Sequence, residues 1–259
     1  MGKNVIGICK LCQTDNAVLR CSHIIPEFAF DTVYDKKHRF VYFTPDSNDG
    51  VTFEQQGFRE NLLCQKCETW LSKYEKILQS FLIEVNTNKN NTIKRRSNNS
   101  MSMKEIQYNE VKIALLSILY RMSISKREEF RGYSLGTKEE EFRDIIYTGK
   151  FTDEYTFPIH VSRVVVNGNF CKDQIATYGE KSKHNGAYTY NSFVIYGLLI
   201  DIMLSNQIAH NDVWYDRNLK ENGELIIYDI ERRDARIEDN LLNRFHDKDV
   251  KIYMENLKY

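Results

Sequence analysis

The chain has 259 residues, and its 36 lysines and arginines balance 36 aspartates and glutamates, so the formal net charge is zero. A hydrophobic fraction of 42% and a charged fraction of 28% are typical of a globular protein, with one large or two smaller domains. The neutral balance excludes a chain that is basic throughout, as nonspecific nucleic-acid coats are. It leaves room for a small basic site.

Five of the six cysteines lie within the first 67 residues. We find no secretory signal, and the longest apolar run, 193–204, is too short to span a membrane and contains Asp201. We therefore expect a soluble, cytoplasmic protein with no membrane partner. In such a protein, clustered cysteines indicate metal binding or catalysis before disulfides.

The first 85 residues combine short strands with one clear helix. Strand-like runs occur at 4–8, 17–21, 39–43 and 51–53, and Pro26 marks a helix start. A helix is predicted after the last clustered cysteine, because apolar side chains recur there at three- and four-residue spacing: Trp70, Leu71, Tyr74, Leu78, Phe81 and Leu82.

Residues 86–104 interrupt this pattern and are predicted to be a basic polar linker. The segment is rich in asparagine and serine and has no acidic residue. It contains five basic residues: Lys89, Lys94, Arg95, Arg96 and Lys104. They are either a solvated face of the linker or contacts to the phosphates of a nucleic acid.

The rest of the chain, 105–259, is predicted to be a mixed α+β domain of unknown role. Helices are expected over 104–128 and from Thr137, strands follow from about residue 155, and one or two short helices close the chain at 235–257. We recognise no catalytic motif in this half. The fold class expected for the whole chain is therefore α+β.

Two Cys-x2-Cys pairs give the strongest chemical indication in the sequence. They are Cys9 with Cys12 and Cys64 with Cys67. A two-residue spacing lets both sulfurs of one turn face the same ion, and a tetrahedral Zn²⁺ needs two such turns. We therefore predict a structural zinc site. Cys21 lies between the pairs and is expected to be packed or to line a cleft.

The segment between the pairs contains Cys21-Ser22-His23-Ile24-Ile25-Pro26, and Glu60-Asn61-Leu62-Leu63 leads into the second pair. Together these elements resemble a zinc-braced HNH endonuclease domain over about residues 6–80. The resemblance implies a treble-clef-like ββα unit within residues 1–85. It also implies His23 as the general base, Asn61 as the orienting amide and Glu68 as a ligand of Mg²⁺ or Mn²⁺.

The sequence departs from that family at two metal-ligand positions. Ser22 stands where an acid usually precedes the histidine, and Glu68 replaces a histidine of the helix. Asp31 or Asp35 could supply a carboxylate, and His23 could instead be a fifth candidate ligand of the zinc or make a structural hydrogen bond near it.

The expected function is a metal-dependent endonuclease that acts on nucleic acid, with DNA as the first candidate. HNH-like domains joined to unfamiliar domains often belong to bacterial defence or mobile-element proteins, so the resemblance suggests that role. The alternative is a zinc-braced module that binds nucleic acid or protein without catalysis.

Overall fold

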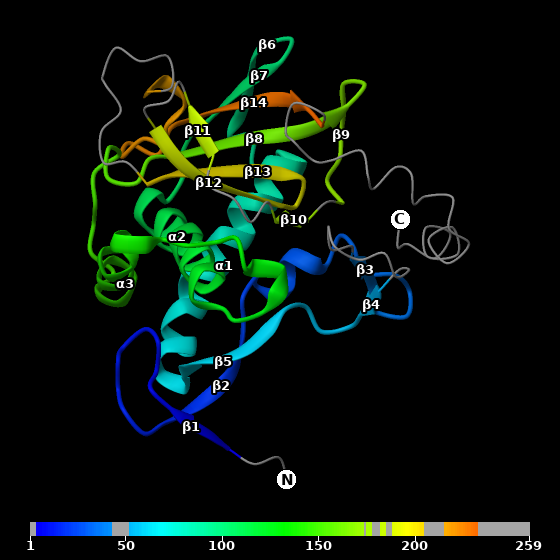
Figure 1. Ribbon diagram of the computed structural model, residues 1–259. Helices are drawn as coiled ribbons and strands as arrows, with labels where there is room; N and C mark the ends of the chain where they lie inside the picture. Colours follow the sequence, from blue (N-terminus) through cyan, green and yellow to red (C-terminus); the bar gives the residue numbers. More distant parts are fainter. Residues whose placement is uncertain are drawn as a thin grey trace.

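The computed structural model describes residues 4–42, 52–173, 175–177, 182–184, 188–204 and 215–232. These residues form an α+β fold, as expected, with three α-helices, two larger sheets and a two-stranded ribbon (Figure 1). The short helices expected at 235–257 lie outside the described residues. Among the described residues, no helix combines the length and apolar character needed to cross a membrane.

The N-terminal sheet consists of β1 (Val5–Gly7), β2 (Ala17–His23) and β5 (Arg59–Cys64), with β2 in the centre. All its pairs are antiparallel. Helix α1 (Gln65–Thr87) follows β5 directly and packs on this sheet (Figure 1). The chain thus forms a strand–strand–helix unit that contains both cysteine pairs.

Helix α1 is the helix predicted after the second cysteine pair. Its core-facing stripe is fully buried at Leu71, Leu78, Phe81 and Leu82. Trp70, at the edge of the stripe, donates its indole N–H to the Ile146 carbonyl at 3.0 Å. The three- to four-residue spacing therefore placed both the helix and its buried face correctly.

A nine-stranded sheet forms the second layer, in the order β10-β12-β13-β8-β14-β7-β6, with β11 and β9 paired to β12 and β8. Only β14 and β8 run parallel among the described pairs. The strands are β6 (Ile93–Ser97), β7 (Ser100–Met103), β8 (Ile159–Val166), β9 (Asn169–Phe170), β10 (Ala176–Thr177), β11 (Ser182–His184), β12 (Tyr188–Ile195), β13 (Leu198–Met203) and β14 (Leu225–Glu231).

The segment 86–104 is not the linker that its composition predicted. It holds the last residues of α1 and the hairpin β6–β7, which extends the large sheet beyond β14. Met101 and Met103 of β7 are buried, whereas Lys94 to Ser97 of β6 are exposed. An edge strand with few apolar side chains has the polar composition of a loop, which explains the wrong prediction.

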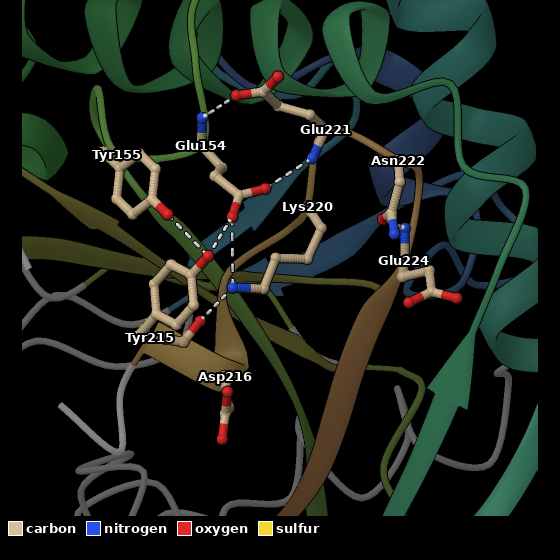
Figure 2. A pocket seen from close by; sticks show the side chains of 8 residues that line it. All are labelled: Glu154, Tyr155, Tyr215, Asp216, Lys220, Glu221, Asn222 and Glu224. Carbon is tan, nitrogen blue, oxygen red and sulfur yellow. Dashed lines mark hydrogen bonds and ion pairs between the residues drawn. The ribbon is translucent and has the colours of Figure 1, made fainter. Parts of the chain in front are cut away.

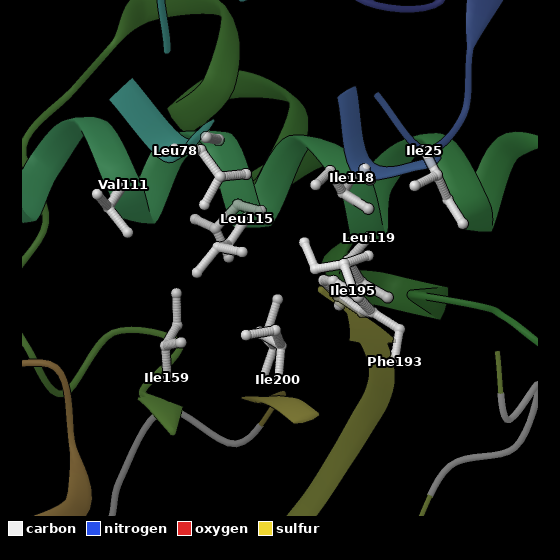
Figure 3. Close-up of a cluster of buried hydrophobic side chains, with 14 of the residues drawn as sticks. Ile25, Leu78, Val111, Leu115, Ile118, Leu119, Ile159, Phe193, Ile195 and Ile200 are labelled. Atoms are coloured by element: carbon white, nitrogen blue, oxygen red, sulfur yellow. The ribbon is translucent and has the colours of Figure 1, made fainter. Parts of the chain in front are cut away.

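Helix α2 (Tyr108–Ile124) lies between α1 and the large sheet and is buried on nearly every side. Its apolar side chains face Ile159, Phe193, Ile195 and Ile200 of the sheet (Figure 3). Side chains of the strand–strand–helix unit, such as Leu78, join the same hydrophobic cluster. The two halves of the chain therefore share one continuous core.

Shorter elements complete the fold. Helix α3 (Glu139–Thr148) packs on α2. The remaining elements are the ribbon strands β3 (Phe40–Tyr42) and β4 (Thr52–Glu54), and the 3-10 turns Glu27–Phe30, Glu128–Phe130, Gly136–Lys138 and Tyr215–Arg217.

A buried arginine of α2 connects the three elements around His23. Arg121 is 1% exposed, and its Nη1 donates to the His23 carbonyl at 2.6 Å. Its Nη2 pairs with Glu75 Oε1 of α1 at 2.7 Å, and its Nε donates to the Ser117 carbonyl at 3.2 Å. The guanidinium thus joins α2 to both β2 and α1.

We expect Arg121→Met to lower the free energy of unfolding by about 3 kcal/mol, because it leaves Glu75 and a buried carbonyl without their partner. Urea denaturation would measure the change. Arg131→Ala is the control, because Arg131 and Glu128 are 71% and 65% exposed, and it should cost less than about 1 kcal/mol. Equal losses in the two variants would contradict a structural role for Arg121.

Candidate metal centre and histidine site

The first cysteine pair lies in a tight turn between β1 and β2. The Gln13 N–H donates to the Cys9 carbonyl at 2.9 Å, and the Cys9 N–H donates to the Thr14 carbonyl at 3.0 Å. Gln13 itself adopts a left-handed conformation with φ of 59°. This turn brings the side chains of Cys9 and Cys12 to the same side.

The second pair lies where β5 becomes α1. Cys64 caps the helix, and Cys67 falls in its first turn. Negative charge is favoured at this end of a helix, so the position suits thiolates. The Lys10 N–H donates to the Leu62 carbonyl at 3.0 Å, which joins the first turn to the strand that leads into the second pair.

The two pairs form one cluster. The four sulfurs of Cys9, Cys12, Cys64 and Cys67 lie within 4.8 Å of one another, and those of Cys12 and Cys64 are 3.8 Å apart. Sulfurs bound to one zinc ion at about 2.3 Å in a tetrahedron are about 3.8 Å apart. The cluster could therefore hold a metal ion, and its geometry is compatible with structural zinc.

Hydrogen bonds prepare the cluster for negative charge. The thiol of Cys67 donates to Cys9 and, with nearby backbone N–H groups, lowers the pKa of Cys9 to about 4. The Cys64 N–H is one of these groups, at 3.3 Å from Cys9 Sγ. The bond to Cys9 raises the pKa of Cys67. These hydrogen bonds favour a thiolate in the cluster, and a bound cation would replace the shared protons.

His23 ends β2 and faces a carboxylate four residues later in the chain. Pro26 starts the 3-10 turn Glu27–Phe30, which returns Glu27 to the histidine. His23 Nε2 lies 2.7 Å from Glu27 Oε2, an ion-pair contact that does not meet hydrogen-bond geometry, so this buried nitrogen has no hydrogen-bond partner among the described residues. The His23 side chain as a whole is 28% exposed. One ring nitrogen therefore faces the Glu27 carboxylate, and the ring remains partly accessible.

Three further donors surround Glu27. Tyr34 donates its hydroxyl to Oε1 at 2.7 Å, Arg59 Nη2 lies 3.2 Å from Oε2, and His38 Nε2 lies 3.8 Å from Oε1. We call Glu27, His23, Tyr34, His38 and Arg59 the Glu27 cluster. Burial opposes ionisation of Glu27, but the hydrogen bonds from Tyr34 and Arg59 outweigh it and lower its pKa.

The same surroundings keep His23 neutral. Burial and the positive charge of Arg59 lower its pKa below the ordinary 6.5, and the Glu27 carboxylate only partly offsets them. A neutral imidazole at pH 7 can accept a proton. In this respect the environment is suited to a general base.

Glu68 lies on the other face of β2. Its carboxylate accepts a hydrogen bond from the Ser22 hydroxyl, which in turn accepts the Leu63 N–H at 3.2 Å. Burial raises the pKa of Glu68. Ser22 and His23 are successive strand residues, so their side chains project to opposite faces of the sheet. The structure thus brings Glu68 to Ser22 and does not bring it to His23.

Asn61 is exposed on β5 and lies opposite Cys21 in the strand pairing. The register of the strand pair shifts between Arg20 and Cys21, and the side chains of Arg20 and Cys21 are both exposed. Cys21 is therefore at the surface, not packed in the core. No hydrogen bond joins Asn61 to His23 within the described part of the chain, although both residues are on the same face.

The five basic residues do not form one patch. Lys89 follows α1, and Lys104 pairs with Glu224 at 2.6 Å. On β6, Lys94 lies opposite Ser102 and Arg95 opposite Met101, so their side chains project to opposite faces. Arg96 is exposed and lies where the register shifts, between Arg95 and Ser97. Because β6 follows the far end of α1, these residues are separated from the cysteines by a helix about 33 Å long.

Four members of the Glu27 cluster were not predicted from the sequence: Glu27, Tyr34, His38 and Arg59. Glu27 could have been inferred from its position four residues after His23 across a proline turn. Tyr34, His38 and Arg59 depend on a loop and on the pairing of β2 with β5, which have no local signature. Asp35, considered as a carboxylate donor, is buried and bonded to Arg39 at 2.8 Å.

A hollow lies beside β14, and Figure 2 shows the side chains that line it. Tyr155 and Tyr215 stack there with 5.3 Å between ring centres. Lys220 Nζ lies 3.1 Å from the centre of the Tyr215 ring and 3.5 Å from Glu154. These groups satisfy one another, and none of the predicted site residues lines the hollow.

We expect the purified protein to contain one zinc ion per chain, and Cys67→Ser to lose it and unfold at a lower temperature. Elemental analysis and thermal denaturation would measure the two effects. Cys21→Ser is the matched control, because Cys21 is exposed and outside the cluster. Equal zinc content in both variants would rule out the four-cysteine site.

Comparison with known proteins assigns no family. No family model matches the chain, and none of the curated proteins or solved structures compared with it matches either. The function therefore has to be argued from the cysteine cluster and the Glu27 cluster.

Proposed function

We propose that the chain is a metal-dependent endonuclease of the HNH type that hydrolyses phosphodiester bonds of nucleic acid, with DNA as the first candidate. The observation that carries the proposal is the pairing of His23 Nε2 with Glu27 Oε2 at 2.7 Å. It occurs where a strand ends, in a strand–strand–helix unit with a four-cysteine cluster. In this proposal the unit is treble-clef-like and its zinc is structural.

The proposed chemistry places His23 as the base. With Nε2 directed at the Glu27 carboxylate, the other ring nitrogen, Nδ1, takes the proton of the attacking water. Glu27 fixes the ring orientation and stabilises the charge that the ring acquires. Asn61, on the same face, is proposed to contact the substrate or the loop that presents it.

Glu68 is the proposed holder of Mg²⁺ or Mn²⁺. Its carboxylate and the Ser22 hydroxyl are already in contact, so two oxygen ligands are adjacent, and such ions take few protein ligands besides water. When bound, the ion would stabilise charge on the phosphate oxygens. The exposed residues Lys94, Arg95 and Arg96 are proposed as further phosphate contacts on an extended substrate.

One observation favours a second candidate function, a zinc-braced binding module without catalysis. Glu68 bonds to Ser22 on the face of β2 opposite His23, so the proposed base and metal ligand do not meet. Such a module would bind nucleic acid in a salt-dependent manner without cleaving it.

Replacing the proposed base tests the nuclease directly. We expect His23→Ala to reduce the cleavage rate about 100-fold or more, because a positioned general base contributes about 10²–10⁴. The assay follows plasmid DNA and RNA with Mg²⁺, Mn²⁺ or Ni²⁺. Cys21→Ala, two residues away on the same strand, should cleave normally. Undiminished cleavage by His23→Ala, at unchanged zinc content and folding, would refute His23 as the base.

The pH dependence follows from the environment of His23. Its pKa lies below the ordinary 6.5, so the active neutral form persists at neutral pH. The cleavage rate should fall as the pH drops through this lowered pKa. The unfolded chain binds the His23 proton more readily than the folded chain. The free energy of unfolding should therefore decline as the pH falls from about 6.5 to the lowered pKa of folded His23.

We expect Glu27→Gln to move the His23 titration to still lower pH, because the Glu27 carboxylate favours the protonated ring. NMR titration of the His23 ring in both proteins would measure this independently of activity. His38→Ala is the control and should shift the titration less, because His38 touches Glu27 only at 3.8 Å. A His23 pKa above 6.5 in the unmodified protein would contradict the expected environment.

A further inference from the structure

Arg59 is the residue that faces His23 across the strand pair. The two residues are directly opposite in the pairing of β2 with β5. Side chains at opposite positions of antiparallel strands lie on the same face and close together. The Arg59 side chain is 31% exposed, so its guanidinium is reachable from solvent next to the imidazole.

The guanidinium of Arg59 retains unused hydrogen-bonding capacity. Its Nε donates to the Gln56 carbonyl at 2.7 Å, and its Nη2 reaches Glu27 Oε2 at 3.2 Å. A guanidinium has five N–H donors. Among the described residues, the remaining Arg59 donors have no partner.

Two neighbouring arginines are bound differently. Arg39 holds Asp35 through both Nε, at 3.1 Å, and Nη2, at 2.8 Å. Arg127 holds Glu129 through the same two nitrogens, at 3.2 and 2.8 Å. Arg59 instead shares one carboxylate oxygen with His23. The pairing of Arg59 with a carboxylate is therefore the weakest of the three, and its remaining N–H donors have no partner among the described residues.

We infer that Arg59 binds the phosphate group of the substrate beside His23. A phosphodiester offers two non-bridging oxygens, which match two adjacent N–H donors of a guanidinium. The contact would place the phosphorus atom next to the imidazole that accepts the proton of the water. This inference rests on the proposed function, because it names a substrate contact of the same site.

Glu27 has a second effect in this arrangement. It neutralises Arg59 in the free protein and occupies one of its donors. An incoming phosphate therefore competes with Glu27 for the guanidinium. Removal of the carboxylate charge should consequently strengthen phosphate binding, whereas a purely structural Arg59–Glu27 pair would give no such gain.

The test measures binding without turnover, using zinc-loaded protein with no added Mg²⁺ or Mn²⁺. The probes are fluorescein-labelled DNA and RNA 20-mers, followed by fluorescence anisotropy. Arg59→Ala should weaken binding of the preferred probe at least tenfold and reduce the slope of log Kd against log salt by about 0.9 for a duplex probe or about 0.7 for a single strand. Arg59→Lys should lose less, and Glu27→Gln should bind more tightly than the unmodified protein.

Arg20→Ala is the matched control, because Arg20 is an exposed arginine on the same sheet and gives the same change of charge. It should change Kd less than threefold. Binding by Arg59→Ala that equals binding by Arg20→Ala would overturn the inference. So would a Glu27→Gln variant that binds no more tightly.

The results separate this inference from the proposed function. Arg59-dependent binding in a protein that cleaves neither DNA nor RNA with any divalent ion would refute the nuclease and support the phosphate contact. Cleavage that is lost in His23→Ala but unchanged in rate and KM in Arg59→Ala would support the nuclease and overturn the phosphate contact.

Discussion

The buried guanidinium of Arg121 is the interaction on which the His23 site depends. It binds the His23 carbonyl and Glu75 together, so α2 fixes both the strand that carries the histidine and the helix that follows the cysteines. Burial of an arginine is costly unless all its donors are paired, so these contacts hold or fail as a unit. The position of His23 is therefore set by a residue 98 positions later in the chain, and the N-terminal unit needs the second half to keep its geometry.

A second constraint divides the chemistry of β2 between its two faces. Ser22 and Glu68 meet on the face covered by α1, whereas His23 faces Glu27 and Arg59. The strand ends at His23, and only beyond this end can one substrate reach groups from both faces. A phosphate held at the end of β2 would lie beside the imidazole. A cation held by Glu68 would have to approach the same phosphate around the strand end, and this is the strictest geometric demand of the nuclease proposal.

The parts of the structure that the sequence predicted are those with local patterns. Cys-x2-Cys spacing fixed each half of the cysteine cluster, and the stripe from Leu71 to Leu82 fixed α1. The failures involve long-range partners. The polar strand β6 is a strand only because β7 pairs with it, and Arg59 meets Glu27 only through the register of β2 and β5. Neither partnership leaves a repeat in the sequence.

The charge of the Glu27 cluster connects the fold to the proposed substrate. One carboxylate faces Arg59, the Tyr34 hydroxyl and two imidazoles, so the Glu27 cluster as defined combines one acid with several donors. The positive charge of Arg59 lowers the pKa of His23, and the Glu27 carboxylate partly offsets this effect. Without Glu27, the His23 ring would accept a proton less readily. With Glu27, the charges of Arg59 and the carboxylate balance, and in the proposed phosphate contact the donors of Arg59 that have no partner among the described residues would bind the anion. The zero net charge of the chain is therefore compatible with the proposed phosphate contact, because such short-range contacts do not depend on net charge.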